Sequence, residues 1–212
     1  MPWTTLDSIS TGCRRLAGWV GCAALVASVA APQAAHAQSI TYRLDPNHTS
    51  IQWEVQHFRT STLRGRFNDV QGSIKIDAQA GTGEISMVLN VATVSTGVPV
   101  LDATLRGEQF FDVKRYPQAF FVSRNIQFQG GNPAHVYGEL TLRDNSLPLT
   151  LRATNFNCYE SPTIRQTVCG GDFEAELYRS AAGLGYGLPL VGDRVRLRIQ
   201  VEAAREEAPL IR

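Results

Sequence analysis

The chain has almost no excess of charge of either sign, which argues against a nucleic-acid partner. It contains 20 lysines and arginines against 19 aspartates and glutamates in 212 residues. Domains that bind phosphate backbones usually show a clear basic excess with clustered basic side chains. The densest basic stretch, residues 194–198, alternates three arginines with Val195 and Leu197, as the solvent-facing side of a strand does. We therefore predict no nucleic-acid partner.

The sequence also lacks the motifs of several enzyme classes. It has no GxSxG, CxxC, HxxxH or HExxH pattern, and these spacings mark serine nucleophiles, dithiol sites and helical zinc sites. A carboxylate pair of Glu54 and Asp69 is a poor candidate, because Glu54 falls on the solvent face of its predicted strand. We predict that the protein is not an enzyme and has no catalytic residue, no metal and no cofactor.

No apolar run is long enough to cross a bilayer as a helix, which takes about 20 residues. The longest covers residues 16–31. It follows the arginine pair at positions 14 and 15 and precedes the small-x-small sequence AHA at positions 35–37, which is the three-part pattern of a secretory leader. We predict that residues 1–37 are a cleaved signal peptide.

Two other kinds of leader fit this region less well. The arginine pair lacks most of a twin-arginine consensus, and the apolar run continues past Cys22, where a lipoprotein leader would end. Residues 38–212 then form a single domain, in a protein that is periplasmic or secreted. Removing Asp7 and the two leader arginines leaves 18 charges of each sign.

Cysteine is scarce as well. Only Cys158 and Cys169 follow the predicted leader, and an even pair in an oxidising compartment predicts a disulfide. A bridge closing a loop of this size stabilises by about 3 kcal/mol in the chain-entropy model. The alternative is a two-cysteine metal or redox site, against which stand the missing CxxC spacing and the absence of a histidine nearby in the sequence.

The clearest structural signal in the sequence is the alternation of apolar and polar residues. From Ile51 to His57, apolar residues and a terminal imidazole alternate with Gln52, Glu54 and Gln56, as in a strand with one buried face. Short segments of this kind predict an antiparallel sandwich or barrel, although a one-residue slip at a bulge would exchange the two faces locally. Eight further segments show the pattern, at residues 42–44, 72–77, 84–91, 119–123, 136–142, 149–153, 173–177 and 195–201.

One segment breaks the alternation. Residues 101–107, LDATLRG, predict a short helix with Asp102 as its N-cap and Gly107 as its stop. Phe110 and Phe111 follow it. They either cap the apolar interior of the barrel or belong to an ordinary core.

The order of these segments resembles the YceI-like family of bacterial exported proteins. The resemblance covers nearly all of residues 38–212 and rests on NHTSIQWEVQHF with LRGRF, LDATLRGEQFFDVKRYPQAFF, YGELTLRDNSLPLTL and YRSAAGLGYGLPLVGDRVRLRIQVEA. It implies an all-β fold, an extended eight-stranded antiparallel lipocalin-like barrel with a short helix inserted mid-chain. It also implies a lumen that holds a long isoprenoid chain, without a catalytic centre.

The chain departs from the family pattern at one turn. Members commonly have a histidine-glycine pair after LTL, where this chain has Arg143 and Asp144, so the turn would present a different rim. Arg64, Arg66, Asp102 and Asp112 are predicted to form ion pairs at the barrel mouth. The alternative is that an arginine there contacts a diphosphate or quinone head group.

We predict a lipid-binding protein whose lumen holds a polyisoprenoid or isoprenoid-quinone-like chain, for transport, storage or shielding. The alternative is a barrel with a filled core that binds a membrane protein partner. A dimer and a transient membrane contact both stay open, and His57 either bonds a buried partner or touches the polar end of the ligand. The predicted ligand-binding residues are Trp53, Val55, His57, Phe67, Ile74, Ile76, Ile85, Met87, Leu89, Phe110, Phe111, Phe121 and Leu140.

Overall fold

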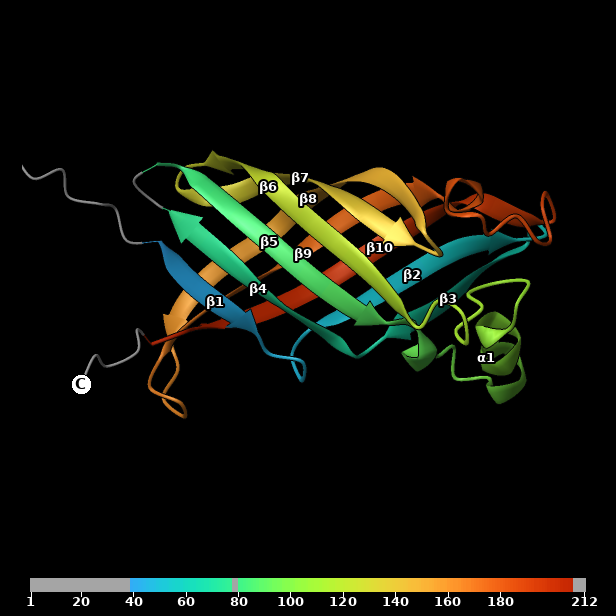
Figure 1. The fold of residues 1–212 in the computed structure, drawn as a ribbon, viewed down its shortest axis with the longest axis horizontal. Helices are drawn as coiled ribbons and strands as arrows, with labels where there is room; N and C mark the ends of the chain where they lie inside the picture. The colour runs from blue at the N-terminus through green and yellow to red at the C-terminus, as the bar shows by residue number, and fades with distance from the viewer. Residues whose placement is uncertain (1–38, 78–79, 208–212) are drawn as a thin grey trace, which may run out of the picture. The chain divides into compact units, whose positions relative to one another are not determined.

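A computed structural model describes residues 39–77 and 80–207, and the predicted signal peptide lies outside these described residues. Within them the chain forms strands, one α-helix and two 3-10 turns (Figure 1). The elements are β1 (Ile40–Leu44), β2 (Ser50–His57), β3 (Ser61–Phe67), β4 (Val70–Asp77), β5 (Thr82–Asn90), η1 (Val91–Thr93), α1 (Pro99–Arg106), β6 (Gln118–Gln129), β7 (Asn132–Leu142), β8 (Asn145–Glu160), β9 (Thr167–Tyr178), η2 (Arg179–Ala182) and β10 (Val191–Arg205).

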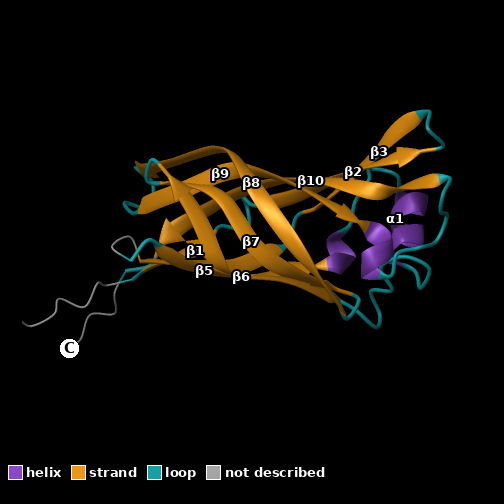
Figure 2. Ribbon diagram, turned by 90° about the horizontal axis from the view of Figure 1, so that it is seen from above, coloured by secondary structure: helices purple, strands orange, loops and turns teal. Residues whose placement is uncertain are grey.

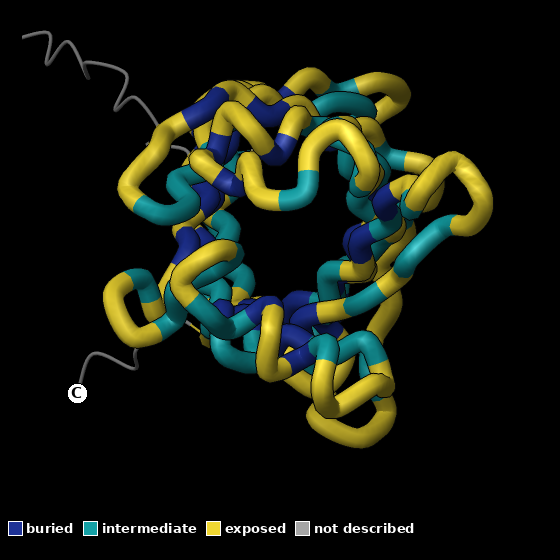
Figure 3. Tube along the Cα trace, turned by 90° about the vertical axis from the view of Figure 1, so that its right-hand side faces the viewer, coloured by how far each residue is buried: buried dark blue, intermediate teal, exposed yellow. Residues whose placement is uncertain are grey.

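The strands close into an antiparallel barrel with eight positions. Its order is β1, β4, β5, β6, β7, β8, β9 and β10, and β10 returns to β1 with Tyr42 opposite Arg205. Further along, β10 pairs with β2, and β2 pairs with β3. Strands β1 and β2 therefore share one position of the ring, and β3 and β4 share the next. Seen end-on, the backbone runs as a ring (Figure 3). The predicted eight-stranded barrel is confirmed.

Strand β3 is the element that the alternation did not predict. The chain reverses between β2 and β3 at Phe58 and Arg59, whose φ angles are 49° and 56°. Hairpin positions with positive φ usually carry asparagine, aspartate or glycine, and neither residue gives that signal. The sequence therefore gives no signal for this turn, although Leu63 and Phe67 do alternate with polar residues.

The outer edge of β3 is covered by residues 91–117, which connect β5 to β6, contain α1 and are called here the α1 segment. Arg66 and Ser95 exchange backbone hydrogen bonds of 2.8 and 2.9 Å across this edge. Figure 2 shows α1 beside β2 and β3 at one end of the barrel. Covering an exposed edge in this way removes a template for pairing with another chain.

The predicted start of the helix is wrong. Helix α1 begins at Pro99 with Val98 as its N-cap, and Asp102 lies inside its first turn. Proline suits the first helical position, because its fixed φ is already helical and its missing N–H has no partner there. The predicted stop is confirmed, since Gly107 is the C-cap.

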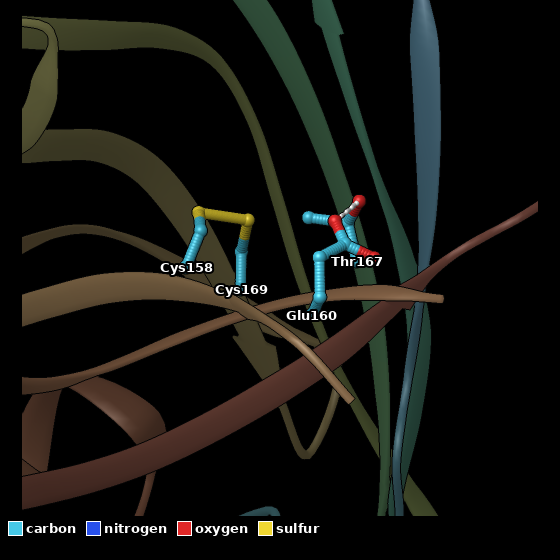
Figure 4. Close-up of a disulfide and its surroundings, with 4 residues drawn as sticks. All are labelled: Cys158, Glu160, Thr167 and Cys169. Carbon is cyan, nitrogen blue, oxygen red and sulfur yellow. Dashed lines mark hydrogen bonds between the residues drawn. A yellow bond between two sulfur atoms is a disulfide. The ribbon is translucent and has the colours of Figure 1, made fainter. Parts of the chain in front are cut away.

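Cys158 and Cys169 form a disulfide between β8 and β9, as predicted. They are directly opposite each other in the register of this strand pair, and their Cα atoms are 4.1 Å apart. Two residues further out, the Thr167 hydroxyl donates to Glu160 Oε1 at 2.6 Å (Figure 4). The β8–β9 hairpin is thus fastened at its tip, at the end of the barrel opposite α1 (Figure 1).

Replacing both cysteines by serine should lower the free energy of unfolding by up to about 3 kcal/mol, because the open chain gains the entropy that the closed loop withholds. Urea denaturation of the oxidised protein and of the double variant measures the difference. The reduced wild-type protein is the control and should match the variant. Equal stability of all three would show that the hairpin restrains the loop without the bridge.

Candidate functional site

The inward faces of the strands enclose an apolar cavity of about 280 Å³. Its wall draws on β2 to β10, on α1 and on η2. Sites for small molecules are typically concave and lined by apolar side chains with a few polar groups. The structure brings together most of the predicted ligand-binding residues in this wall, namely Trp53, Val55, His57, Phe67, Ile74, Ile85, Met87, Leu89, Phe110, Phe111, Phe121 and Leu140.

Ile76 is the predicted ligand-binding residue that the structure leaves out of the cavity wall. It has the same parity on β4 as Ile74 but lies nearer the β4–β5 turn, opposite Gly83. There it packs against the buried core of the barrel. Parity along a strand identifies the inward face but does not show how far the cavity extends along it.

Several wall residues escaped the prediction. Leu63 lies on the unpredicted strand β3, and Leu101 and Leu105 come from one face of α1 at the i, i+4 spacing that brings side chains together on a helix. That spacing was visible in the sequence. The sequence does not show, however, that the helix lies beside β2 and β3 at one end of the barrel (Figure 2).

Phe110 and Phe111 both line the cavity and also pack into the surrounding core, so the two predicted alternatives describe the same arrangement. Phe111 meets the ring of Phe67 edge to face, with centroids 5.4 Å apart. Phe110 meets Tyr186 in the same way, also at 5.4 Å. The two rings therefore connect the α1 segment to β3 on one side and to the loop before β10 on the other.

The α1 segment is held in place by two polar side chains. The buried carboxylate of Asp102 accepts hydrogen bonds from the backbone N–H and the hydroxyl of Thr96, each at 2.6 Å. Arg106 donates to the carbonyl oxygens of Ala92 and Val94 at 2.8 and 2.7 Å. The hydrogen bonds from Thr96, with a smaller effect of the nearby Arg106 charge, hold the pKa of Asp102 below its usual value.

Asp102→Asn should loosen the α1 segment at neutral pH. The lowered pKa means that the wild-type contact is intact above the ordinary carboxyl pKa of 3.8 and is lost as pH falls through the folded-state value. An amide has no charge to lose, so the variant should show the weaker protection throughout. Hydrogen-exchange protection of the Thr96 amide at pH 7 and pH 3 tests this. Equal protection in the two proteins at pH 7 would contradict it.

Trp53 occupies the wall where β2 faces β3. Its indole lies against Gly65, its partner in the register, and a Cβ at Gly65 would come within 2.3 Å of the ring. The indole Nε1–H is buried and has no hydrogen-bond partner in the described part of the chain. A polar donor thus lies among the mostly apolar side chains of the wall.

The three histidines of the described residues do not form a metal-binding group. His57 lines the cavity and meets Phe58 edge to face, with centroids 4.6 Å apart. His48 lies in the β1–β2 turn, where its Nδ1 is 2.6 Å from Asp45 Oδ2, and His135 lies in β7. Over residues 39–77 and 80–207, no three histidine, cysteine, aspartate or glutamate side chains are placed to hold a metal. In the same ranges no helix is long and apolar enough to span a bilayer.

Arg179, which the sequence did not single out, is the buried charge of the cavity wall. It begins η2, directly after β9, and is only 6% exposed. Its guanidinium donates to backbone carbonyl oxygens of the following loop and of the start of β10, including Gly192 from Nε at 2.8 Å and Val191 from Nη2 at 2.9 Å. Burial lowers the pKa of Arg179, and the charge of Asp193 opposes that shift.

The arginines predicted at the mouth do not line the cavity. Arg64 Nε donates to Glu54 Oε1 at 3.1 Å on the outer face of β2 and β3, and Arg66 contributes its backbone to the edge contact with Ser95. Arg143 has a φ of 51° in the β7–β8 turn and donates to the carbonyl oxygens of Gly183 at 2.9 Å and Glu108 at 3.4 Å. Arg143 therefore links the loop after η2 to the residues that follow α1.

Comparison with known proteins agrees with this architecture. A UPF0312 protein of Pseudomonas putida strain F1 is 32% identical over 135 residues, which is 62% of this chain and 70% of the relative. The crystal structure of Burkholderia cenocepacia BcnA matches with a TM-score of 0.63 at 25% identity and covers 76% of this chain and 99% of that one.

A polyisoprenoid binding domain from Saccharophagus degradans shares the fold. Its TM-score is 0.57 at 14% identity, over 78% of this chain and 98% of that domain. The model of the YceI-like domain matches residues 42–203, which spans the barrel from β1 to β10. The chain therefore belongs to the YceI-like family.

Proposed function

We propose that this protein binds the chain of a polyisoprenoid or an isoprenoid quinone in the barrel lumen and carries, stores or shields it in an aqueous compartment. The observation that carries the proposal is the cavity, whose wall is apolar apart from a few polar groups and continues from the barrel core to the α1 segment. Each buried methylene gains about 0.8 kcal/mol. A slender chain can therefore bind without many polar contacts.

Two further observations support the proposal. The related fold from Saccharophagus degradans is described as a polyisoprenoid binding domain. The leader pattern of residues 1–37 and the disulfide fit a protein of the periplasm or the extracellular space. We propose a binding role without catalysis, since no set of side chains resembling a catalytic centre lines the cavity within the described residues.

Mass spectrometry of the copurified lipid tests the proposal. The full chain is produced in a bacterial host, purified, extracted with organic solvent, and compared with an extract from the empty-vector control. We expect a prenyl lipid or quinone in near-stoichiometric amount. A folded protein whose extract matches the control would instead favour the barrel with a filled core and a protein partner.

A further inference from the structure

The cavity wall has two ionisable side chains, His57 and Arg179, and both lie at the same end. The register of β2 and β10 pairs His57 with Val191, and Arg179 Nη2 donates to the carbonyl oxygen of Val191 at 2.9 Å. All other residues of the wall are apolar apart from the indole N–H of Trp53 and the thioether of Met87. A few polar groups at one point of an apolar site usually fix the orientation of its ligand.

The guanidinium of Arg179 is almost fully bonded to the backbone, with one N–H to spare. Of its five N–H groups, one on Nε donates to Gly192, two on Nη1 donate to Leu184 and to Tyr186 at 2.9 Å, and one on Nη2 donates to Val191. The second N–H of Nη2 has no acceptor in the described part of the chain. The loop that Arg179 organises thereby holds the group rigidly in the wall.

Among residues 39–77 and 80–207, no carboxylate forms an ion pair with this buried charge. Asp193, whose charge acts on Arg179, accepts hydrogen bonds from the backbone N–H and hydroxyl of Ser180, at 2.9 and 2.7 Å. A buried guanidinium that has only neutral acceptors keeps much of its desolvation cost. An anionic oxygen brought in by a ligand would offset that cost.

We propose that Arg179 is a head-group site that selects lipids ending in an anionic oxygen, a carboxylate or a phosphate, over neutral lipids of the same chain. The inference rests on the proposed function, since the chain occupies the lumen. The anion accepts the free Nη2–H in a charge-assisted hydrogen bond, which is stronger than a neutral one. His57, which pairs with Val191 in the register, lines the same end of the cavity and supplies a second polar contact.

The test compares two ligands with the same prenyl chain, one ending in a carboxylate and the other in its neutral methyl ester. Geranylgeranoic acid and its methyl ester each displace tritiated geranylgeraniol from the delipidated full-length protein at pH 7.5, where the acid is ionised. We expect the acid to bind at least tenfold more tightly than the ester. Equal affinity of the two would overturn this inference alone, whereas binding of none of the three lipids would overturn the proposed function with it.

Variants then assign the selectivity to one side chain. Arg179→Gln should reduce the preference for the acid to less than about twofold, and Arg179→Lys should keep part of it. Arg194→Gln is the matched control. Arg194 lies opposite Tyr178 on the next strand and faces solvent beside Glu176. Its replacement by glutamine removes the same charge as Arg179→Gln does. An undiminished acid preference in a folded Arg179→Gln protein would overturn the assignment.

Thermal melting shows whether each variant is folded. If Arg179→Gln does not fold, the comparison of acid and ester on the wild-type protein still decides whether the lumen selects an anion. Arg179→Lys then decides whether Arg179 is responsible, since a conserved charge with altered geometry should weaken the preference without reversing it. An unchanged preference in Arg179→Lys would in that case count against the proposed site.

Discussion

Met87→Trp should strip the barrel of its lipid and leave it folded. Met87 faces the cavity from β5, opposite Phe121 on β6. A bulkier ring at this position has room to enter a cavity of about 280 Å³, and it would then occupy space that a slender chain needs. We expect the amount of copurified prenyl lipid to fall at least tenfold, while the urea midpoint changes little.

Val122→Trp is the control for this experiment. Val122 lies on the neighbouring strand with its side chain 49% exposed on the outer face, so the same large ring there should leave the lipid content unchanged. If the interior were filled rather than hollow, Met87→Trp would instead cost roughly 1–3 kcal/mol from overpacking. Unchanged lipid content in both variants would argue against the lumen as the binding site.

Gly65→Ala should destabilise the protein at the α1 end of the barrel. The added methyl group would come within 2.3 and 2.6 Å of two ring atoms of Trp53 and 3.0 Å of the Ser95 carbonyl oxygen. Relief requires the indole to move into the lumen or the Ser95 segment to leave the edge of β3. We expect a loss of roughly 1–3 kcal/mol, measured by urea denaturation.

Gly185→Ala provides the comparison for Gly65→Ala. A Cβ at Gly185 meets no atom within 4 Å, so this substitution should change stability by less than about 0.5 kcal/mol. The emission of Trp53 gives a second readout, because only Gly65→Ala should alter the surroundings of the indole. Equal stability of the two variants would mean that the Trp53 indole moves aside without lowering the free energy of unfolding.

The inward faces of the strands were predictable because they depend on a local pattern. The alternation through Trp53, Val55 and His57 identifies one face whatever the remainder of the chain does, and all three line the cavity. The same reasoning placed Ile74, Ile85 and Met87 without knowledge of their partners. The pattern does not show how far the cavity extends along a strand. It therefore also predicts Ile76 as a ligand-binding residue, which lies outside the cavity wall.

Arg179 could not be predicted because its burial depends on the loop that follows it. An arginine after a strand looks like a surface residue, and its acceptors at Leu184, Tyr186, Val191 and Gly192 converge only once that loop has folded back. The start of α1 was missed for a related reason. Asp102 has the chemistry of an N-cap, but its carboxylate accepts hydrogen bonds from Thr96 in the loop before the helix, and the helix already begins at Pro99.

The pairing of β10 with β1, β2 and β9 also fixes when the lumen can first exist. Strand β10 is the last strand of the described chain, and it alone joins β9 to the strands from the beginning. Until it is in place, an incomplete chain has open sheet edges on both sides and no enclosed interior. Contacts between distant parts of a chain also form slowly. If the lumen binds a lipid as proposed, uptake requires the finished polypeptide, so loading would follow synthesis.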